Sequence, residues 1–95
     1  MAAYVIADVE ITDPEKYTEY TAQTPDSIAA HGGRFIVRGG PHEVLEGDWR
    51  PGRVVVIEFP DVDAALGWYR SEDYQELAKI RQAASTARIL VVEGA

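Results

Sequence analysis

The chain has 95 residues, enough for a single domain over residues 1–95 built from one sheet and a few helices. It contains no cysteine, and its 16 acidic residues against 9 basic ones give a net charge of −7. This composition excludes disulfides and thiolate metal sites and argues against nucleic acid, whose binding requires neutralised phosphates. No apolar run reaches the roughly 20 residues that cross a bilayer, and the N-terminus lacks a signal-peptide pattern, so we expect a cytoplasmic protein without a membrane partner.

Alternating apolar residues predict a first strand over residues 3–11. The next segment begins a helix, because Asp13 is a favourable N-cap and Pro14 fits the first helical turn. Pro25 repeats the proline signal within this helix, which predicts a kink or a restart. Gly32 is then expected to end the helix in the left-handed conformation.

A second strand is predicted over residues 34–38, between two glycine pairs. The connection over residues 41–52 is long and has room for a short edge strand at residues 42–46. The segment RVVVIEF, residues 53–59, is the clearest strand of the chain.

Two helices and a last strand complete the pattern. Asp61 opens a helix that runs to residue 70, and Ser71 caps another over residues 72–84. Residues 88–93 form the final predicted strand. The order β-α-β-β-α-α-β predicts an α+β, ferredoxin-like fold, in which a four-stranded antiparallel sheet carries its helices on one face.

Side chains alternate along a strand, so the sequence indicates which residues share a face of the sheet. If the second and third strands pair with Arg38 near Val54, Arg34 falls opposite Glu58. One face is then wholly apolar and suits the helices; it holds Phe35, Val37, Val55, Ile57 and Phe59. The other face holds Tyr4, Ile6, Asp8, Arg34, Ile36, Arg38, Val54, Val56 and Glu58.

No element remains to cover this second face, although much of it is aliphatic. A second copy of the chain is the simplest cover, and it predicts a two-fold homodimer with the pair Arg34–Glu58 near the interface. The alternative is a solvated face with ordinary cross-strand ion pairs.

The stretch HGGRFIVRGG, residues 31–40, is not a phosphate-binding loop, because its first glycine pair ends a helix rather than opening one. His31 has two interpretations. It either stabilises the helix C-terminus, or it stands at the mouth of a pocket as an acid/base group near neutral pH. The only other histidine is His42, and neither lies in a metal-binding spacing, so no metal or other cofactor is predicted.

Aromatic residues and one arginine suggest where a ligand would bind. A pocket is expected between the apolar sheet face and the helices, lined by Phe35, by Trp68 or Tyr69, and by Tyr74, with His31 and Arg81 as polar anchors. Trp49, in the long connection, is expected to act as a lid. The alternative is a filled aromatic core with an arginine that extends to solvent.

The blocks HGGRFIVRGG, EVLEGDW, RVVVIEFP, WYRSEDYQ and VVEG resemble the bacterial family of domain of unknown function 1330 over nearly the whole chain. This resemblance implies a dimeric α/β barrel, in which two ferredoxin-like sheets pack face to face. The wider group includes cofactor-free monooxygenases, isomerases and ligand-binding regulatory domains. The matching blocks nominate His31, Arg34, Arg38, Glu58, Tyr69 and Tyr74.

Three functional hypotheses follow. The first is a cofactor-free enzyme acting on a phenolic, enolic or carbonyl substrate, with His31 as acid/base and Arg38 or Arg81 orienting an oxyanion. The second is a non-catalytic dimer that binds a metabolite or a protein, and the third is a purely structural dimer. The candidate ligand-binding residues are Arg34, Trp49, Glu58, Trp68, Tyr69, Tyr74 and Arg81.

Overall fold

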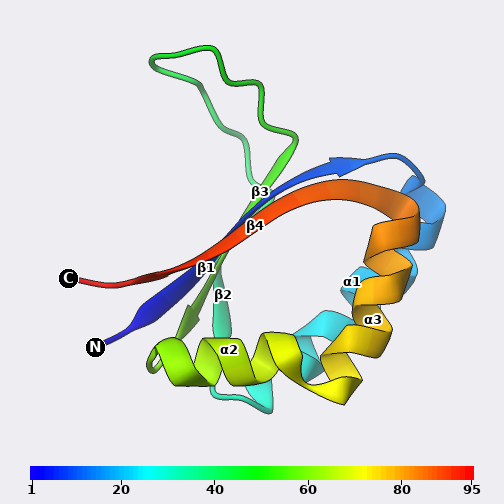
Figure 1. The fold of residues 1–95 in the computed structure, drawn as a ribbon. Helices are drawn as coiled ribbons and strands as arrows, with labels where there is room; N and C mark the ends of the chain where they lie inside the picture. Colours follow the sequence, from blue (N-terminus) through cyan, green and yellow to red (C-terminus); the bar gives the residue numbers. More distant parts are fainter.

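The computed structural model describes residues 1–95 as a four-stranded antiparallel sheet with three helices on one face (Figure 1). The strands lie in the order β2-β3-β1-β4, which confirms the predicted ferredoxin-like fold. The strands are β1 (Ala3–Ile11), β2 (Arg34–Arg38), β3 (Arg53–Phe59) and β4 (Ser85–Glu93). The helices are α1 (Pro14–Ala29), α2 (Val62–Arg70) and α3 (Glu72–Ala84), and none of them is long and apolar enough to cross a membrane.

Each helix begins at the predicted capping residue. The side chains of Asp13, Asp61 and Ser71 each accept a backbone N–H from three residues further on, at 3.1, 2.7 and 3.2 Å. The predicted restart does not occur, because α1 continues through Pro25 as one helix. β4 begins at Ser85, earlier than predicted, directly after α3.

The end of α1 confirms the prediction for Gly32, whose φ is 79°. The Gly33 N–H donates to the carbonyl of Ile28 and the Gly32 N–H to that of Ala29, both at 3.0 Å. These two bonds satisfy carbonyls that the helix leaves free and turn the chain sharply into β2.

Replacing Gly32 with alanine should lower the free energy of unfolding by about 1 kcal/mol, because a Cβ is disfavoured at this φ. The matched control is Gly67→Ala within α2, where a Cβ meets open space. That substitution should raise stability by up to about 1 kcal/mol through helix propensity. Urea unfolding of both variants checks the pair, and equal stabilities would contradict the left-handed cap.

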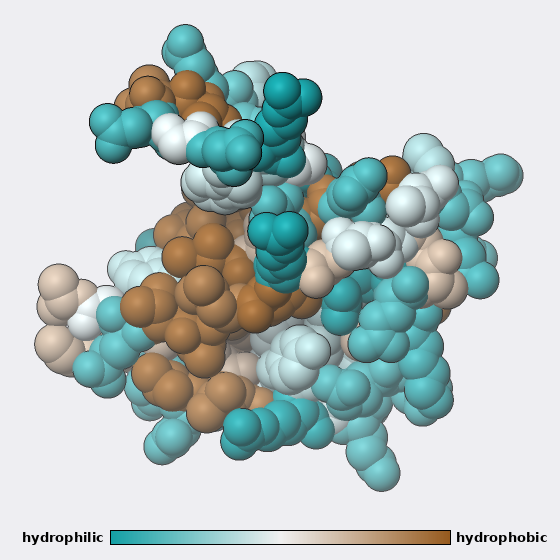
Figure 2. Space-filling model, turned by 45° about the horizontal axis from the view of Figure 1, so that its top comes forward, coloured by the Kyte–Doolittle hydropathy of each residue, from teal (hydrophilic) through white to brown (hydrophobic).

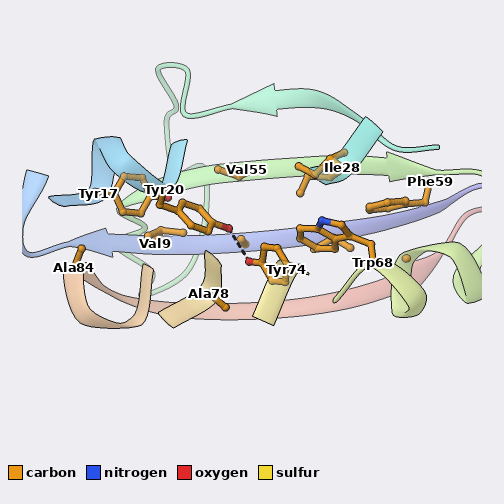
Figure 3. Packing of buried hydrophobic residues seen from close by; sticks show 14 residues of the cluster. Val9, Tyr17, Tyr20, Ile28, Val55, Phe59, Trp68, Tyr74, Ala78 and Ala84 are labelled. Atoms are coloured by element: carbon orange, nitrogen blue, oxygen red, sulfur yellow. Dashed lines mark hydrogen bonds between the residues drawn. The ribbon is translucent and has the colours of Figure 1, made fainter. Parts of the chain in front are cut away.

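The core lies between the sheet and the helices and is rich in aromatic side chains (Figure 3). The rings of Trp68 and Tyr74 lie 4.0 Å apart between centroids, and those of Phe59 and Trp68 lie 5.4 Å apart. All three side chains are almost fully buried, so they fix α2 and α3 on the sheet.

The predicted pairing of Arg34 with Glu58 across β2 and β3 is confirmed. The guanidinium Nε of Arg34 donates to the Glu58 carboxylate at 2.9 Å, and the Tyr4 hydroxyl donates to its other oxygen at 3.3 Å. These side chains lie on the face that the helices leave uncovered, called the bare face below.

The register beyond this pair differs from the prediction. A β-bulge between Phe35 and Val37 inserts one residue into β2, so that Arg38 pairs with Val55 rather than with Val54. One extra residue exchanges the two faces of a strand. Val37 therefore lies on the bare face, and Arg38 lies on the helix-covered side, opposite to the prediction for both.

Residues 39–52 form an arm that rises above the sheet on the side away from the helices (Figure 1). The predicted edge strand at residues 42–46 is not formed. The arm is fixed at its base by Asp8, whose carboxylate accepts the indole N–H of Trp49 at 3.0 Å and the backbone N–H of Gly52 at 2.9 Å. These two bonds hold the pKa of Asp8 below its ordinary value.

The bare face has an apolar centre beside the arm (Figure 2). Its alternating residues are half-buried or exposed aliphatic side chains, namely Ile6, Val37, Val54, Val56, Leu90 and Val92. Polar groups bound it at both ends, with Glu58 at one and Asp8 at the other. No element of the chain covers these side chains.

Candidate functional site

A cavity of about 40 Å³ lies between the sheet and the helices. Its walls are mainly apolar and aromatic and include Phe35, Trp68 and Tyr74. Its polar lining comes from α1, β2, β3 and α3 and consists of Tyr17, Tyr20, Thr21, Thr24, Arg38, Arg53, Tyr74 and Arg81.

Two tyrosine hydroxyls meet in this cavity. Those of Tyr20 and Tyr74 share a hydrogen bond of 2.6 Å, which joins α1 to α3 across the layer (Figure 3). Burial, with a further contribution from Tyr74, raises the pKa of Tyr20 far above its ordinary value. Tyr20 therefore keeps its proton near neutral pH and does not serve as a base.

Arg81, from α3, is the most deeply buried cation of the chain, with 6% of its surface exposed. Its Nε is buried and has no hydrogen-bond partner. No carboxylate pairs with it, because the two ion pairs of the chain are Arg34–Glu58 and Lys79–Glu76. Burial disfavours its charge, but its tyrosine neighbours, first among them Tyr74, outweigh this effect and raise the pKa of Arg81.

Arg53, the first residue of β3, supplies a second buried guanidinium Nε without a partner. Its head packs against Gly39, where any Cβ would collide with it. Arg53 also lies beside Tyr17, whose pKa is raised by burial while the nearby guanidinium opposes the rise. The glycine after β2 therefore makes room for an arginine of the neighbouring strand.

Arg38 reaches the cavity from β2 because of the bulge. One of its terminal nitrogens donates to the backbone carbonyl of Thr21 at 3.1 Å, and its guanidinium lies 4.4 Å from the centre of the Phe35 ring. It is the one solvent-exposed residue among those that line the cavity. It therefore forms the outer part of the lining, between β2 and α1.

The charge of this lining is strongly one-sided. It contains three guanidinium groups and no aspartate, glutamate or histidine. Guanidinium groups and neutral tyrosine hydroxyls are hydrogen-bond donors that match the oxygens of an anion. The cavity can thus hold and stabilise an oxyanion, but it offers no carboxylate or imidazole to take up a proton.

The structure brings together Phe35, Arg38, Trp68, Tyr74 and Arg81 from the predicted site. The other predicted residues lie outside the cavity. His31 is half-buried near the end of α1, so its predicted role at the pocket mouth finds no support there. Trp49 is not a lid over the cavity, because its bond to Asp8 holds it on the bare face.

Arg34 and Glu58 pair with each other on the bare face, away from the helices. Tyr69 packs edge-on against Trp68, with centroids 6.2 Å apart, and borders an open apolar groove between α2 and β4. Nowhere in the chain do three or more histidine, cysteine or acidic side chains gather so that they could hold a metal ion.

Three residues of the site are missing from the sequence-based set, namely Arg53, Tyr17 and Tyr20. Arg53 has a recognisable signal, because it shares strand parity with Val55 and Ile57 and so lies on the helix-covered face. The two tyrosines lie three positions apart on one face of α1, but their shared chemistry depends on the approach of α3.

Several solved structures are similar to this chain in fold. The protein of unknown function RPA0582 from Rhodopseudomonas palustris has a TM-score of 0.80 and 22% identity over 99% of this chain and 82% of its own. A dimeric ferredoxin-like protein of unknown function from Jannaschia sp. CCS1 has a TM-score of 0.73 and 14% identity over 99% of this chain and 100% of its own. SnoaB, a cofactor-independent oxygenase from Streptomyces nogalater, has a TM-score of 0.65 and 18% identity over 99% of this chain and 92% of its own.

At these identities the solved structures are similar in fold alone. No curated protein matches the chain. The family model described as Domain of unknown function (DUF1330) matches residues 2–95. Since this match spans nearly the whole sequence, the chain belongs to the family of domain of unknown function 1330.

Proposed function

We propose that the cavity binds a small, largely apolar molecule through an oxyanion, which is a carboxylate, an enolate or a phenolate. The observation that carries the proposal is the pair of buried guanidinium nitrogens, Nε of Arg53 and Nε of Arg81, that have no partner in a cavity without carboxylates. Buried polar groups are nearly always hydrogen-bonded, so two buried N–H groups without a partner point to a missing acceptor. An anionic ligand is the acceptor that we propose for these nitrogens.

The walls of the cavity favour a ligand with an apolar or aromatic body. Trp68, Tyr74 and Phe35 offer flat surfaces. The hydrogen bond between the hydroxyls of Tyr20 and Tyr74 uses one of their two protons and leaves the other for a ligand oxygen. Small-molecule sites are usually apolar or aromatic pockets that contain a few polar groups.

A second candidate function is cofactor-free catalysis on a substrate that ionises to an enolate or phenolate. Guanidinium groups and protonated tyrosines, held where negative charge develops, lower the energy of such an anion. The lining contains no base, so the substrate would have to enter as its anion or lose its proton to solvent. The likeness to the oxygenase SnoaB extends to the fold and is compatible with this chemistry.

Calorimetric titration with matched pairs of probes tests the binding proposal. Benzoate and benzamide have the same shape, and 4-nitrophenolate and nitrobenzene have nearly the same shape. In each pair the first molecule is an anion and the second is neutral. The anion of at least one pair should bind about 10-fold or more tightly than its neutral partner, because a charge-assisted bond is the stronger one. If neither anion binds, or if the neutral partners bind equally well, the proposal is wrong.

We also propose that the protein forms a two-fold homodimer through the bare face. The aliphatic centre of that face has no cover within the chain, and Leu90 and Val92 are 55% and 45% exposed. A similar solved structure is described as dimeric, which agrees with this arrangement. The arm extends on the same side of the sheet and would lie beside the second copy (Figure 1).

A further inference from the structure

We propose that Arg38 is both the gate of the cavity and its selector for anions, and that it moves from the Thr21 carbonyl to the incoming ligand. This inference rests on the proposed binding of an oxyanion. It goes further because one side chain, Arg38, would control both entry to the cavity and the preference for anions. Two local irregularities of the backbone determine the position of this side chain.

The first irregularity is Pro25 within α1. In a regular helix the N–H of residue 25 would bond to the carbonyl of Thr21, but proline has no N–H. Within the helix that carbonyl therefore accepts no backbone N–H, and its one helical partner is the Thr24 hydroxyl at a long 3.4 Å. The Arg38 guanidinium occupies it from β2, at 3.1 Å, and so bridges the helix and the strand.

The second irregularity is the β-bulge in β2. Without it Arg38 would lie on the bare face with Arg34, as the regular alternation of the strand predicts. With it the side chain crosses over Phe35, and these two residues and Thr21 border the same part of the cavity. β2 is an edge strand, paired with β3 alone, so this wall has few other restraints.

The size of the cavity requires that some wall opens. A volume of about 40 Å³ has room for roughly two or three water molecules, whereas an engineered cavity of about 150 Å³ is known to take up benzene. A ring-sized ligand cannot enter the closed form. Arg38 is the exposed member of the lining, and one hydrogen bond and a ring contact hold it, so we infer that the wall opens here.

The present partner of Arg38 also explains selectivity. A backbone carbonyl is a neutral acceptor, and a guanidinium binds a carboxylate or another oxyanion more strongly. An anionic ligand can therefore draw Arg38 away from Thr21 and be closed in by it. A neutral ligand offers Arg38 no stronger acceptor, so it has to break the bond between Arg38 and the Thr21 carbonyl without gaining an ion pair.

Stopped-flow and equilibrium binding of benzoate and benzamide test this inference. The background variant is Trp49→Phe, so that Trp68 in the cavity wall is the remaining tryptophan reporter. Arg38→Ala should bind benzoate at least 10-fold more weakly and should take up benzamide several-fold faster, which removes most of the preference for the anion. Lys79→Gln, which removes an exposed charge on α3, is the control and should change neither value.

Pro25→Ala separates the gate from the selector. It returns a backbone N–H to the Thr21 carbonyl and so weakens the bond that Arg38 makes to that carbonyl, but it keeps the charge of Arg38. Benzoate should then bind faster, and its preference over benzamide should remain. If the background variant binds benzoate while Arg38→Ala retains both rate and preference, the role of Arg38 is overturned and the proposed function stands. If the background variant binds neither probe anion, benzoate or 4-nitrophenolate, the proposed function fails and this inference with it.

Discussion

Replacing Arg81 with methionine should make the unliganded protein more stable and should strongly weaken its binding of benzoate. The substitution removes a buried, unpartnered nitrogen and keeps an apolar stem of similar length among the aromatic side chains. Relief of an unsatisfied buried group is worth about 1–2 kcal/mol, or about 5–15 °C in the melting temperature of a chain of this size. A gain in stability that costs function is typical of a binding site.

The loss of binding should amount to at least about 30-fold, the value for removal of one buried partner of a charged pair. Lys79→Met removes the same charge from an exposed position of the same helix and should leave both the melting temperature and the affinity nearly unchanged. Thermal unfolding and calorimetry measure the two effects independently. A variant that is less stable and still binds benzoate would mean that Arg81 belongs to the structure rather than to the site.

Replacing Val56 with aspartate should convert the proposed dimer into a monomer. Val56 lies at the centre of the bare face, paired with Ile6 on one side and Val37 on the other. In a two-fold interface the substitution buries two carboxylates among aliphatic side chains. The dissociation constant should therefore rise by at least about 100-fold.

Light scattering coupled to size-exclusion chromatography at micromolar concentration measures this directly. Gln23→Asp, on the exposed side of α1, adds the same charge away from the bare face and should remain dimeric. A monomeric wild-type protein would rule out the proposed dimer. A dimeric Val56→Asp variant would place the interface elsewhere.

The parts of the fold that depend on local chemistry could be predicted from the sequence. Asp13, Asp61 and Ser71 begin helices because their side chains accept backbone N–H groups that any helix start leaves free. These signals act within a few residues, where the sequence is informative. The pairing of Arg34 with Glu58 follows from strand alternation together with the assumed hairpin register, which holds at this end of β2.

The site could be predicted only in part, because it depends on long-range contacts. The bulge in β2 has no glycine or other local marker at Ile36, and it moved Arg38 to the face opposite the predicted one. Strand parity indicates that Arg53 lies on the helix-covered face. That no acceptor reaches the Nε of Arg53 depends on which side chains the fold brings into the cavity. His31 is a candidate by residue type alone, and its position in the fold separates it from the cavity.

The most direct test of the central claim is a crystal structure of the protein grown with benzoate. The binding proposal predicts the carboxylate inside the cavity, within hydrogen-bond distance of Nε of Arg81 or of Arg53, with its ring against Trp68 or Tyr74. It also predicts that the guanidinium of Arg38 has left the Thr21 carbonyl for the ligand. A cavity that holds only water on these nitrogens at saturating benzoate would contradict it.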